Sequence, residues 1–369
     1  MSSLCQNPQP RQRLPLLRLP FLVQEMILKD VDPIDLVRFS FLSKRARNIA
    51  KAVRFTKIKD VDGILSLGKL HVDFRNNYVS VRVQDSFLSG AVRVEVSERT
   101  RNRPNVLNPK MFHRETVWRN GRMTESNLVA NFSRSRLHEA ARNVIEYLCS
   151  LFRIPVGRVT VNVNDIPNFS KLFIWDLLKG SCADVQLYGM AVQNGEVNKF
   201  FKKFEVKERL VLEVGNHGNM MTHFDKIKNN KLLALWNAKW MQDHHFEQLN
   251  CEYLEVRDTQ VTPQAVNRWF KKWMDSSETH IKVMVISSGH AVRYHFSNVL
   301  VGIEYHSGSE FKEEQTGKFG SFTRSYFEGP RLRRTMIPMR DVATLTRADG
   351  AVAKIGKEGN ELCAYMTYP

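Results

Sequence analysis

The sequence lacks the paired cysteines and the long apolar runs that mark several large classes of protein. Its five cysteines include no Cys-x-x-Cys pair, which excludes zinc-ribbon, RING and thioredoxin-type sites. An odd number of scattered thiols suits a reducing compartment, so we expect the protein to be cytoplasmic, nuclear or both. No apolar run of 18 residues occurs, and arginines interrupt the apolar residues near the N-terminus. We therefore expect neither a membrane span nor a signal peptide.

The sequence patterns of catalysis are missing as well. No G-x-x-x-x-G-K-[ST] loop, G-x-S-x-G elbow, H-E-x-x-H motif or kinase H-R-D motif occurs. The adjacent His244 and His245 would point about 100° apart on a helix, which does not suit a shared metal ion. We therefore expect no catalytic residue, no metal and no cofactor, and we interpret the chain as a non-enzymatic protein.

What the sequence does have is a large excess of positive charge. Lys and Arg total 55 against 38 acidic residues, a formal net charge of +17. Such a charge favours acidic partners. Two stretches concentrate the basic residues: Arg99, Arg101, Arg103, Lys110, Arg114, Arg119 and Arg122, and then Arg324, Arg331, Arg333, Arg334 and Arg340. Two prolines and a glycine in the first stretch predict an exposed loop over residues 99–122.

Residues 14–55 predict three short helices. The first follows Pro20, the second is capped by Asp32 with Pro33 at its first position, and the third begins at Ser43. The second helix is apolar on two sides, so it should bury one face internally and one against a partner. Forty residues are too few for an independent core, which indicates a docking module.

This stretch resembles the F-box family. The family pattern falls without gaps on Leu19, Pro20, Val23, Ile27, Val31, Asp32, Pro33, Asp35, Leu36, Phe39, Leu42, Ser43, Lys44 and Ile49. Two positions depart from it: Leu22 replaces a common acidic residue, and Ala46 replaces the usual tryptophan. F-boxes dock on the small Skp adaptor of SCF cullin–RING ubiquitin ligases. The resemblance therefore implies an adaptor-binding surface made of Leu19, Pro20, Val23, Ile27, Pro33, Leu36 and Phe39.

The rest of the chain alternates between strand and helix patterns. Alternating residues at 70–74, 79–83 and 91–96 predict strands, the first two forming a hairpin around Asn76-Asn77. A helix is predicted over 134–152. Beyond it, short apolar runs recur at 158–163, 184–188, 209–214, 232–236, 252–256 and 281–286. Helical segments fit between most of them, at 168–179, 194–204, 239–249 and 263–274, so we predict parallel strands with helical crossovers.

Two of these repeats are related in sequence. Residues 182–204 align without gaps with 251–273 at seven identical positions. A strand-plus-helix period is the signature of a leucine-rich-repeat-like solenoid, whose parallel strands line a concave face. We expect the repeated aromatic and cysteine residues to be packed inside: Phe200, Phe201, Trp269, Phe270, Cys182 and Cys251.

Residues 230–286 resemble the type-2 F-box-associated domain. The hallmark of that family is a strand, a loop with Thr or Ser, and a helix with the pattern Asn-x-aromatic-aromatic-Lys-x-Trp. The strand is 254–256, the loop residue is Thr262, and the helix pattern covers 267–273. Members of this family are regarded as substrate receptors, so the resemblance implies that this region recruits a target protein.

The predicted fold class is α/β: a three-helix F-box followed by a strand–helix repeat (leucine-rich-repeat-like) domain, with antiparallel β segments at both ends. The Asp-Gly pair at 349–350 predicts a C-terminal hairpin of 341–347 and 352–355, followed by a strand at 361–368, whereas 306–330 is predicted to be a flexible excursion. The predicted divisions are a tail at 1–13, the F-box at 14–55, a β-hairpin and basic linker at 56–125, the repeat domain at 126–305 and a C-terminal β segment at 306–369.

These observations and resemblances favour a substrate-recruiting subunit of an SCF-type ubiquitin ligase. Its expected partners are a Skp-type adaptor with the cullin–RING core, and a target protein. In the strand around Val256, Leu254 and Val256 should point into the core and Glu255 into the concave face. Equivalent positions on that face give the candidate target-binding residues Tyr188, Trp236 and Arg257. The alternative for target binding is that this face is merely solvated and that targets bind the loops 99–122 or 306–330. The alternative is a basic binding module for nucleic acid or an acidic protein surface, unlinked to ubiquitin. The lack of a motif that interleaves aromatic and basic residues argues against nucleic acid.

Overall fold

The computed structural model describes residues 16–53, 58–59, 65–66, 69–83, 91–96, 112–119, 122–189, 195–214, 222–275, 281–289, 294–308, 340–358 and 360–369. The chain divides into two compact units, which we describe separately. Unit 1 comprises residues 1–71 and 77–155, and unit 2 comprises residues 72–76 and 156–369. The expected N-terminal tail, most of the first basic stretch and the expected excursion after residue 308 lie outside the described residues, as do Arg324, Arg331, Arg333 and Arg334.

Unit 1 begins with the three helices that the sequence predicts. A short 3-10 turn, η1 (Leu16–Arg18), precedes α1 (Phe21–Lys29), α2 (Pro33–Ser40) and α3 (Lys44–Ala52). The Asp32 carboxylate accepts a hydrogen bond from the Ile34 amide at 2.7 Å, and the Ser43 hydroxyl accepts one from the Ala46 amide at 3.0 Å. These caps satisfy amides that have no partner within the helix, which explains why α2 and α3 begin where they do.

The rest of unit 1 is a mixed sheet with one long helix. The strands β4 (Tyr78–Val83), β5 (Ala91–Val96), β7 (Arg122–Phe132) and β6 (Phe112–Arg119) lie in that order, with β5 parallel to β7 and the other pairs antiparallel. The turn η3 (Arg134–Arg136) leads into α4 (Leu137–Phe152), which contacts β4 and β5. A separate two-stranded ladder joins β1 (Ile58–Lys59) to β2 (Leu65–Ser66). The helix over 134–152 is thus confirmed.

The sequence interpretation of residues 99–122 as an exposed loop is wrong for its second half. Residues 112–119 form β6 and pair with β7 along their whole length. The prolines and the basic charge that suggested a loop lie mostly before residue 112, whereas Phe112, Val117 and Trp118 favour a strand.

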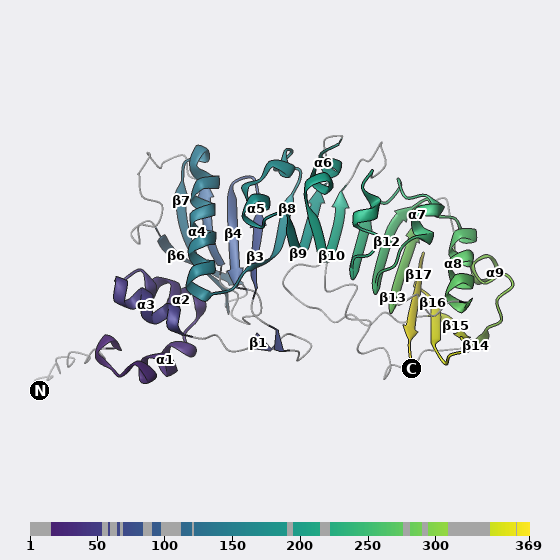
Figure 1. Ribbon diagram of the computed structural model, residues 1–369, viewed down its shortest axis with the longest axis horizontal. Helices are drawn as coiled ribbons and strands as arrows, with labels where there is room; N and C mark the ends of the chain where they lie inside the picture. The colour runs from purple at the N-terminus through teal and green to yellow at the C-terminus, as the bar shows by residue number, and fades with distance from the viewer. Residues whose placement is uncertain are drawn as a thin grey trace, which may run out of the picture. The chain divides into compact units, whose positions relative to one another are not determined.

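Unit 2 is built around parallel strands that follow one another in chain order. These are β8 (Val156–Asn162), β9 (Ser181–Gly189), β10 (Glu205–Val214), β11 (Leu232–Trp236), β12 (Tyr253–Thr259) and β13 (Val283–Ser288), each paired with the next. Figure 1 shows them side by side, with the colour passing from teal to green along the chain. The crossovers carry η4 (Phe169–Lys171), α5 (Phe173–Leu177), α6 (Glu196–Lys203), η5 (Phe224–Lys226), α7 (Asp243–Glu247) and α8 (Pro263–Asp275). The predicted alternation of strands and helices is confirmed.

Antiparallel strands complete the sheet of unit 2 on one side. The chain passes through α9 (Phe296–Val299) and β14 (His306–Gly308) before β15 (Arg340–Thr346), β16 (Val352–Glu358) and β17 (Glu361–Thr367). The strands lie in the order β14, β15, β16, β17, β13, all antiparallel to their neighbours. On the other side of β8 lies β3 (Leu70–Phe74), whose residues 72–74 belong to this unit. The C-terminal hairpin and the further strand are therefore confirmed.

The repeated aromatic residues form the interior of unit 2, as the alignment predicts. Trp269, Phe270, Phe200 and Phe201 are each exposed by no more than 1%. Cys182 at the start of β9 and Cys251 just before β12 are also buried, and burial raises the pKa of the Cys251 thiol to about 12. That thiol stays protonated at neutral pH, which fits a packing residue better than a nucleophile.

Candidate functional sites: an apolar helix surface and a polar strand row

An apolar surface on α1 is the most conspicuous exposed feature of the described residues. Leu22 is 67% exposed and Met26 is 61% exposed, and Leu42, just after α2, is 74% exposed. We define the α1 apolar surface as Phe21, Leu22, Val23, Met26 and Ile27, all of which are exposed. Elsewhere in the described ranges, Val301 and Tyr305 are the large apolar residues with comparable exposure. Such a patch indicates an interaction site, because leaving apolar area in water is unfavourable.

The opposite side of α1 fixes the helix to its neighbours. Gln24 and Leu28 are buried, and α1 contacts α3. The Gln24 side-chain amide donates a 2.6 Å hydrogen bond to the Leu19 carbonyl, which ties the residue before Pro20 to the first turn of the helix. Polar and apolar anchors on one side therefore hold α1 so that the α1 apolar surface faces outward.

The helices α2 and α3 are anchored to the rest of unit 1. The Ser40 hydroxyl lies 2.6 Å from the Tyr147 hydroxyl of α4, and the Phe41 ring stacks on both Tyr147 and Phe112, with centroid distances of 5.3 and 5.2 Å. Asp35 forms an ion pair with Arg114 of β6 at 3.3 Å. The second apolar side expected for α2 is therefore occupied in part by the chain itself.

The sequence-predicted adaptor-binding residues differ in their exposure to solvent. Pro20, Val23 and Ile27 are exposed, and Leu19 and Phe39 are half-buried. Leu36 has no exposed surface, so any contribution it makes to docking is to hold α2 in place. Pro33 occupies the first turn of α2.

Four exposed apolar residues were not among these candidates: Phe21, Leu22, Met26 and Leu42. The four-residue spacing of Leu22 and Met26 is the signal that places them on one helix side.

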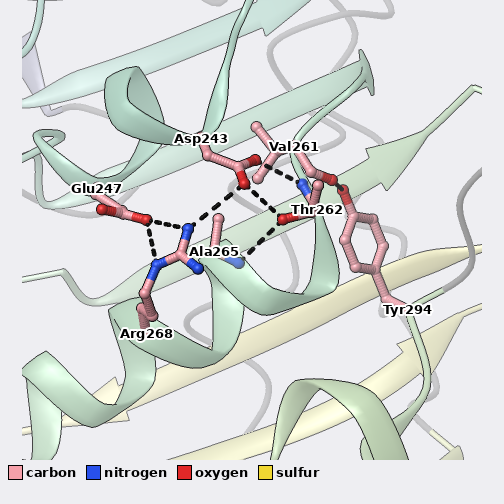
Figure 2. A network of polar contacts seen from close by, with 7 residues as sticks. All are labelled: Asp243, Glu247, Val261, Thr262, Ala265, Arg268 and Tyr294. Carbon is pink, nitrogen blue, oxygen red and sulfur yellow. Dashed lines mark hydrogen bonds and ion pairs between the residues drawn. The ribbon is translucent and has the colours of Figure 1, made fainter.

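A second cluster of polar contacts joins α7 to α8. Figure 2 shows the Asp243 carboxylate receiving hydrogen bonds from the Thr262 amide at 2.8 Å and from the Thr262 hydroxyl at 2.6 Å. The same hydroxyl accepts a bond from the Ala265 amide and so caps α8. The Arg268 guanidinium bridges Asp243 and Glu247, with its shortest ion pair to Glu247 at 2.7 Å. A surface hollow of about 470 Å³ lies beside this network and is lined by Met241, Gln242, Asp243, His244, Glu247, Gln260 and Arg268.

Asn267 and Trp273 of the helix pattern in α8 make contacts that hold the helix in place. The Asn267 side-chain amide donates to the carbonyls of Val299 and Val301, at 2.9 and 3.0 Å, and so ties α8 to the next helix. The Trp273 indole donates to the Tyr368 hydroxyl, and the Arg347 guanidinium lies over its ring with a centroid distance of 5.2 Å. These residues of the pattern therefore pack α8 against α9 and against the C-terminal residues of unit 2.

Thr262→Val should lower the free energy of unfolding of unit 2 by about 1–2 kcal/mol. The substitution keeps the size of the side chain but removes both the cap of α8 and the hydrogen bond to a carboxylate. Chemical denaturation measures the change. The matched control is Thr367→Val, whose exposed hydroxyl makes only a 3.4 Å contact with the Val352 carbonyl. Equal effects of the two substitutions would show that the network contributes nothing.

The candidate target-binding residues lie in one row across the strands of unit 2. Tyr188 pairs with Glu213, and Glu213 pairs with Trp236. Arg257 comes next, because Leu235 pairs with Val256. The Arg257 guanidinium lies 5.0 Å from the Trp236 ring centroid and forms a 3.3 Å ion pair with Glu361. The structure thus places all three candidates, half-buried, on one side of the sheet: Trp236 and Arg257 are in contact, and Tyr188 lies two strands away from Trp236.

Glu255 lies on the side of β12 that also carries Arg257, as expected, but it is buried there and not open to solvent. It is only 4% exposed and shares a row with Val211, Ala234, Val285 and Cys363, all of which are buried. The Glu255 carboxylate accepts a 3.2 Å hydrogen bond from the Trp236 indole and a short one from Arg257. Burial raises the pKa of the Glu255 carboxyl to about 7, and the nearby Arg257 only partly opposes this effect. Both faces of these strands are apolar, as is usual for parallel sheets, and alternation could not assign one of them to solvent.

The raised pKa of Glu255 predicts a dependence of stability on pH. The folded state holds the proton more tightly than the unfolded state, so this contribution to stability is full below about pH 4.5 and is lost as the pH rises to about 7. Glu255→Gln should remove that decline, so that the difference in unfolding free energy between variant and wild type grows from pH 5 to pH 7. Denaturation at a series of pH values measures it, and a constant difference would contradict the prediction.

The described residues offer no group of three His, Cys, Asp or Glu side chains that could hold a metal ion. The rings of His244 and His245 are neighbours, but His245 is buried, and burial lowers the pKa of its imidazole. Within the same described ranges, no helix is both long enough and apolar enough to cross a membrane.

Comparison with known proteins identifies two regions of the chain. The family model for the F-box domain matches residues 16–58, which include α1, α2 and α3. The model for the F-box-associated family matches residues 218–286, which include α7, α8 and the polar network between them. No solved structure matches the chain.

Two similar proteins come from Caenorhabditis elegans. The uncharacterized protein F59B2.9 is 22% identical over 362 residues, which cover 96% of this chain and 77% of that protein. The Skn-1 dependent zygotic transcript 15 protein is 21% identical over 363 residues, which cover 93% of both chains. The two family matches thus show an F-box domain over residues 16–58 and an F-box-associated domain over residues 218–286 of this chain.

Proposed function

We propose that this chain is the substrate-recruiting subunit of an SCF-type cullin–RING ubiquitin ligase. The observation that carries the proposal is the α1 apolar surface, which lies within the residues that match the F-box domain. F-box domains generally bind a Skp-type adaptor, and an exposed apolar helix surface is the kind of site that such a contact would bury.

The role we propose needs no chemistry in the chain itself. The F-box would attach the chain to the adaptor and the cullin–RING core, and unit 2 would hold a target protein near the ubiquitin-loaded enzyme. Catalysis then belongs to other subunits, and proximity is the mechanism. We place this activity in the cytoplasm, the nucleus or both.

The proposal gives the strand–helix stack of unit 2 the role of target receptor. We infer that it is leucine-rich-repeat-like, because β8 to β13 follow one another in parallel with helical crossovers. Tyr188, Trp236 and Arg257 are the residues we propose for target contact. Aromatic and arginine side chains of this kind are enriched where interfaces are strongest.

Affinity purification of the tagged full-length chain, with and without a proteasome inhibitor, tests the proposal. The Skp-type adaptor and a cullin should co-purify in both conditions. Proteins that accumulate on the chain only after inhibition are the expected targets. If neither the adaptor nor a cullin co-purifies with the chain in either condition, the proposed function is wrong.

A further inference from the structure

The strand row that contains Tyr188, Trp236 and Arg257 alternates aromatic and charged side chains. Arg75 lies over the Tyr188 ring at 4.7 Å, and Arg257 lies over the Trp236 ring at 5.0 Å. Between the two aromatic residues stands Glu213, whose register partners are Tyr188 on one side and Trp236 on the other. Neighbouring strands lie about 4.8 Å apart, so both rings are next to the Glu213 side chain.

Arg257 of this row and Arg75 beside it are each paired with a carboxylate, whereas Glu213 forms no ion pair with any described residue. Arg75 pairs with Asp73 at 3.2 Å, and Arg257 pairs with Glu255 and with Glu361. Among the described residues, no hydrogen bond or ion pair reaches the half-buried Glu213 carboxylate, and its one electrostatic neighbour is Arg257. Burial raises the pKa of the Glu213 carboxyl, so its charge is held at a cost to folding.

The formal charge on the row and immediately beside it is opposite in sign to that of the whole chain. Four carboxylates and two guanidiniums gather here: Asp73, Glu213, Glu255, Glu361, Arg75 and Arg257. The chain as a whole carries a formal charge of +17. The other arginines on these strands, Arg158 and Arg209, share Asp184 instead, and Arg209 is four residues from Glu213, or about 13 Å along an extended strand.

We propose that Glu213, between Tyr188 and Trp236, is the seat for one basic side chain, arginine or lysine, of the recruited protein. This rests on the proposed function, because it names the chemistry of the target at the receptor row. A guanidinium or ammonium group would donate a charge-assisted hydrogen bond to the Glu213 carboxylate and would lie between the two aromatic rings. The rest of the row already shows the same arrangement, in which each arginine combines a carboxylate with an aromatic ring.

Degenerate peptide libraries that differ only in one fixed central residue test this seat. The immobilised full-length chain is offered four libraries, with Arg, Lys, Gln or Glu at the fixed position. The wild type should retain the Arg or Lys library roughly tenfold better than the Gln library, the difference expected for one charge-assisted hydrogen bond. The net charge of the chain repels basic peptides, so it cannot produce this preference.

Two variants assign the preference to Glu213. Glu213→Gln keeps the size of the side chain and should retain the Arg, Lys and Gln libraries equally. Glu205→Gln, which makes the same charge change at the other end of β10, should keep the wild-type preference. Because the Glu213 charge is a cost to folding, Glu213→Gln should unfold at the same temperature as the wild type or a higher one at pH 7.

Equal retention of the Arg, Lys and Gln libraries by the wild type would overturn the seat, and so would a preference that survives in Glu213→Gln. Adaptor binding is measured on the same preparations to separate this inference from the proposed function. If the adaptor binds but no basic preference exists, only the seat is wrong. If the preference exists but the adaptor does not bind, the seat stands and the ubiquitin-ligase role fails.

Discussion

Replacing Trp269 by alanine should lower the free energy of unfolding of unit 2 by about 3–5 kcal/mol. The side chain is 1% exposed and lies edge-on to Phe270, with ring centroids 5.3 Å apart. Its removal leaves a cavity in the interior of unit 2, and the cost of such a cavity adds to the lost burial of apolar area. Chemical denaturation, followed by a signal from unit 2, measures the loss.

Tyr305→Ala is the control for this substitution, because it removes an aromatic side chain of unit 2 that is 44% exposed. We expect its effect to stay within about 0.5 kcal/mol, as for most surface substitutions. Similar losses in the two variants would mean that the repeated aromatic residues are not the core of the strand–helix stack.

The second large effect concerns the α1 apolar surface. Leu22→Asp combined with Met26→Asp should weaken binding to a Skp-type adaptor by at least about a hundredfold. Each substitution places an unpaired carboxylate where the complex would bury an apolar side chain, and desolvating such a charge costs several kcal/mol. Both side chains are more than 60% exposed in the free chain, so its folding should be unaffected. Titration of the purified adaptor, together with thermal unfolding of the variant, measures both effects.

Val301→Asp provides the matched control, since it adds the same charge at an exposed apolar position of unit 2. Adaptor binding should be unchanged in this variant. If the double variant binds like the wild type, the α1 apolar surface is not the docking site. If Val301→Asp weakens binding equally, the effect comes from charge and not from the place where it is introduced.

Much of the architecture of this chain could be predicted from local sequence patterns. The predicted strand at 232–236 coincides with β11, and Asp32 and Ser43 cap helices at the predicted positions. These features depend on residues close together in the sequence, such as an apolar run or a side chain that reaches an amide two or three residues ahead.

Features that depend on long-range pairing were less accessible from the sequence. Glu255 alternates with apolar residues in its own strand, a pattern typical of a residue that faces solvent. The residues paired with it on the two neighbouring strands are Ala234 and Val285, and both are buried. The strand β6 was hidden by the basic residues and prolines around it, and its partner β7 stabilises it. Leu22 stood out only as a departure from a family pattern, and its exposure became visible once the buried side of α1 was known.

Titration calorimetry of the wild-type chain with a purified Skp-type adaptor, repeated at several temperatures, tests the central claim most directly. The account predicts a one-to-one complex with a negative heat-capacity change, because the α1 apolar surface would leave water on binding. Absence of a complex at micromolar concentrations would contradict it, and so would a complex that forms without a heat-capacity change.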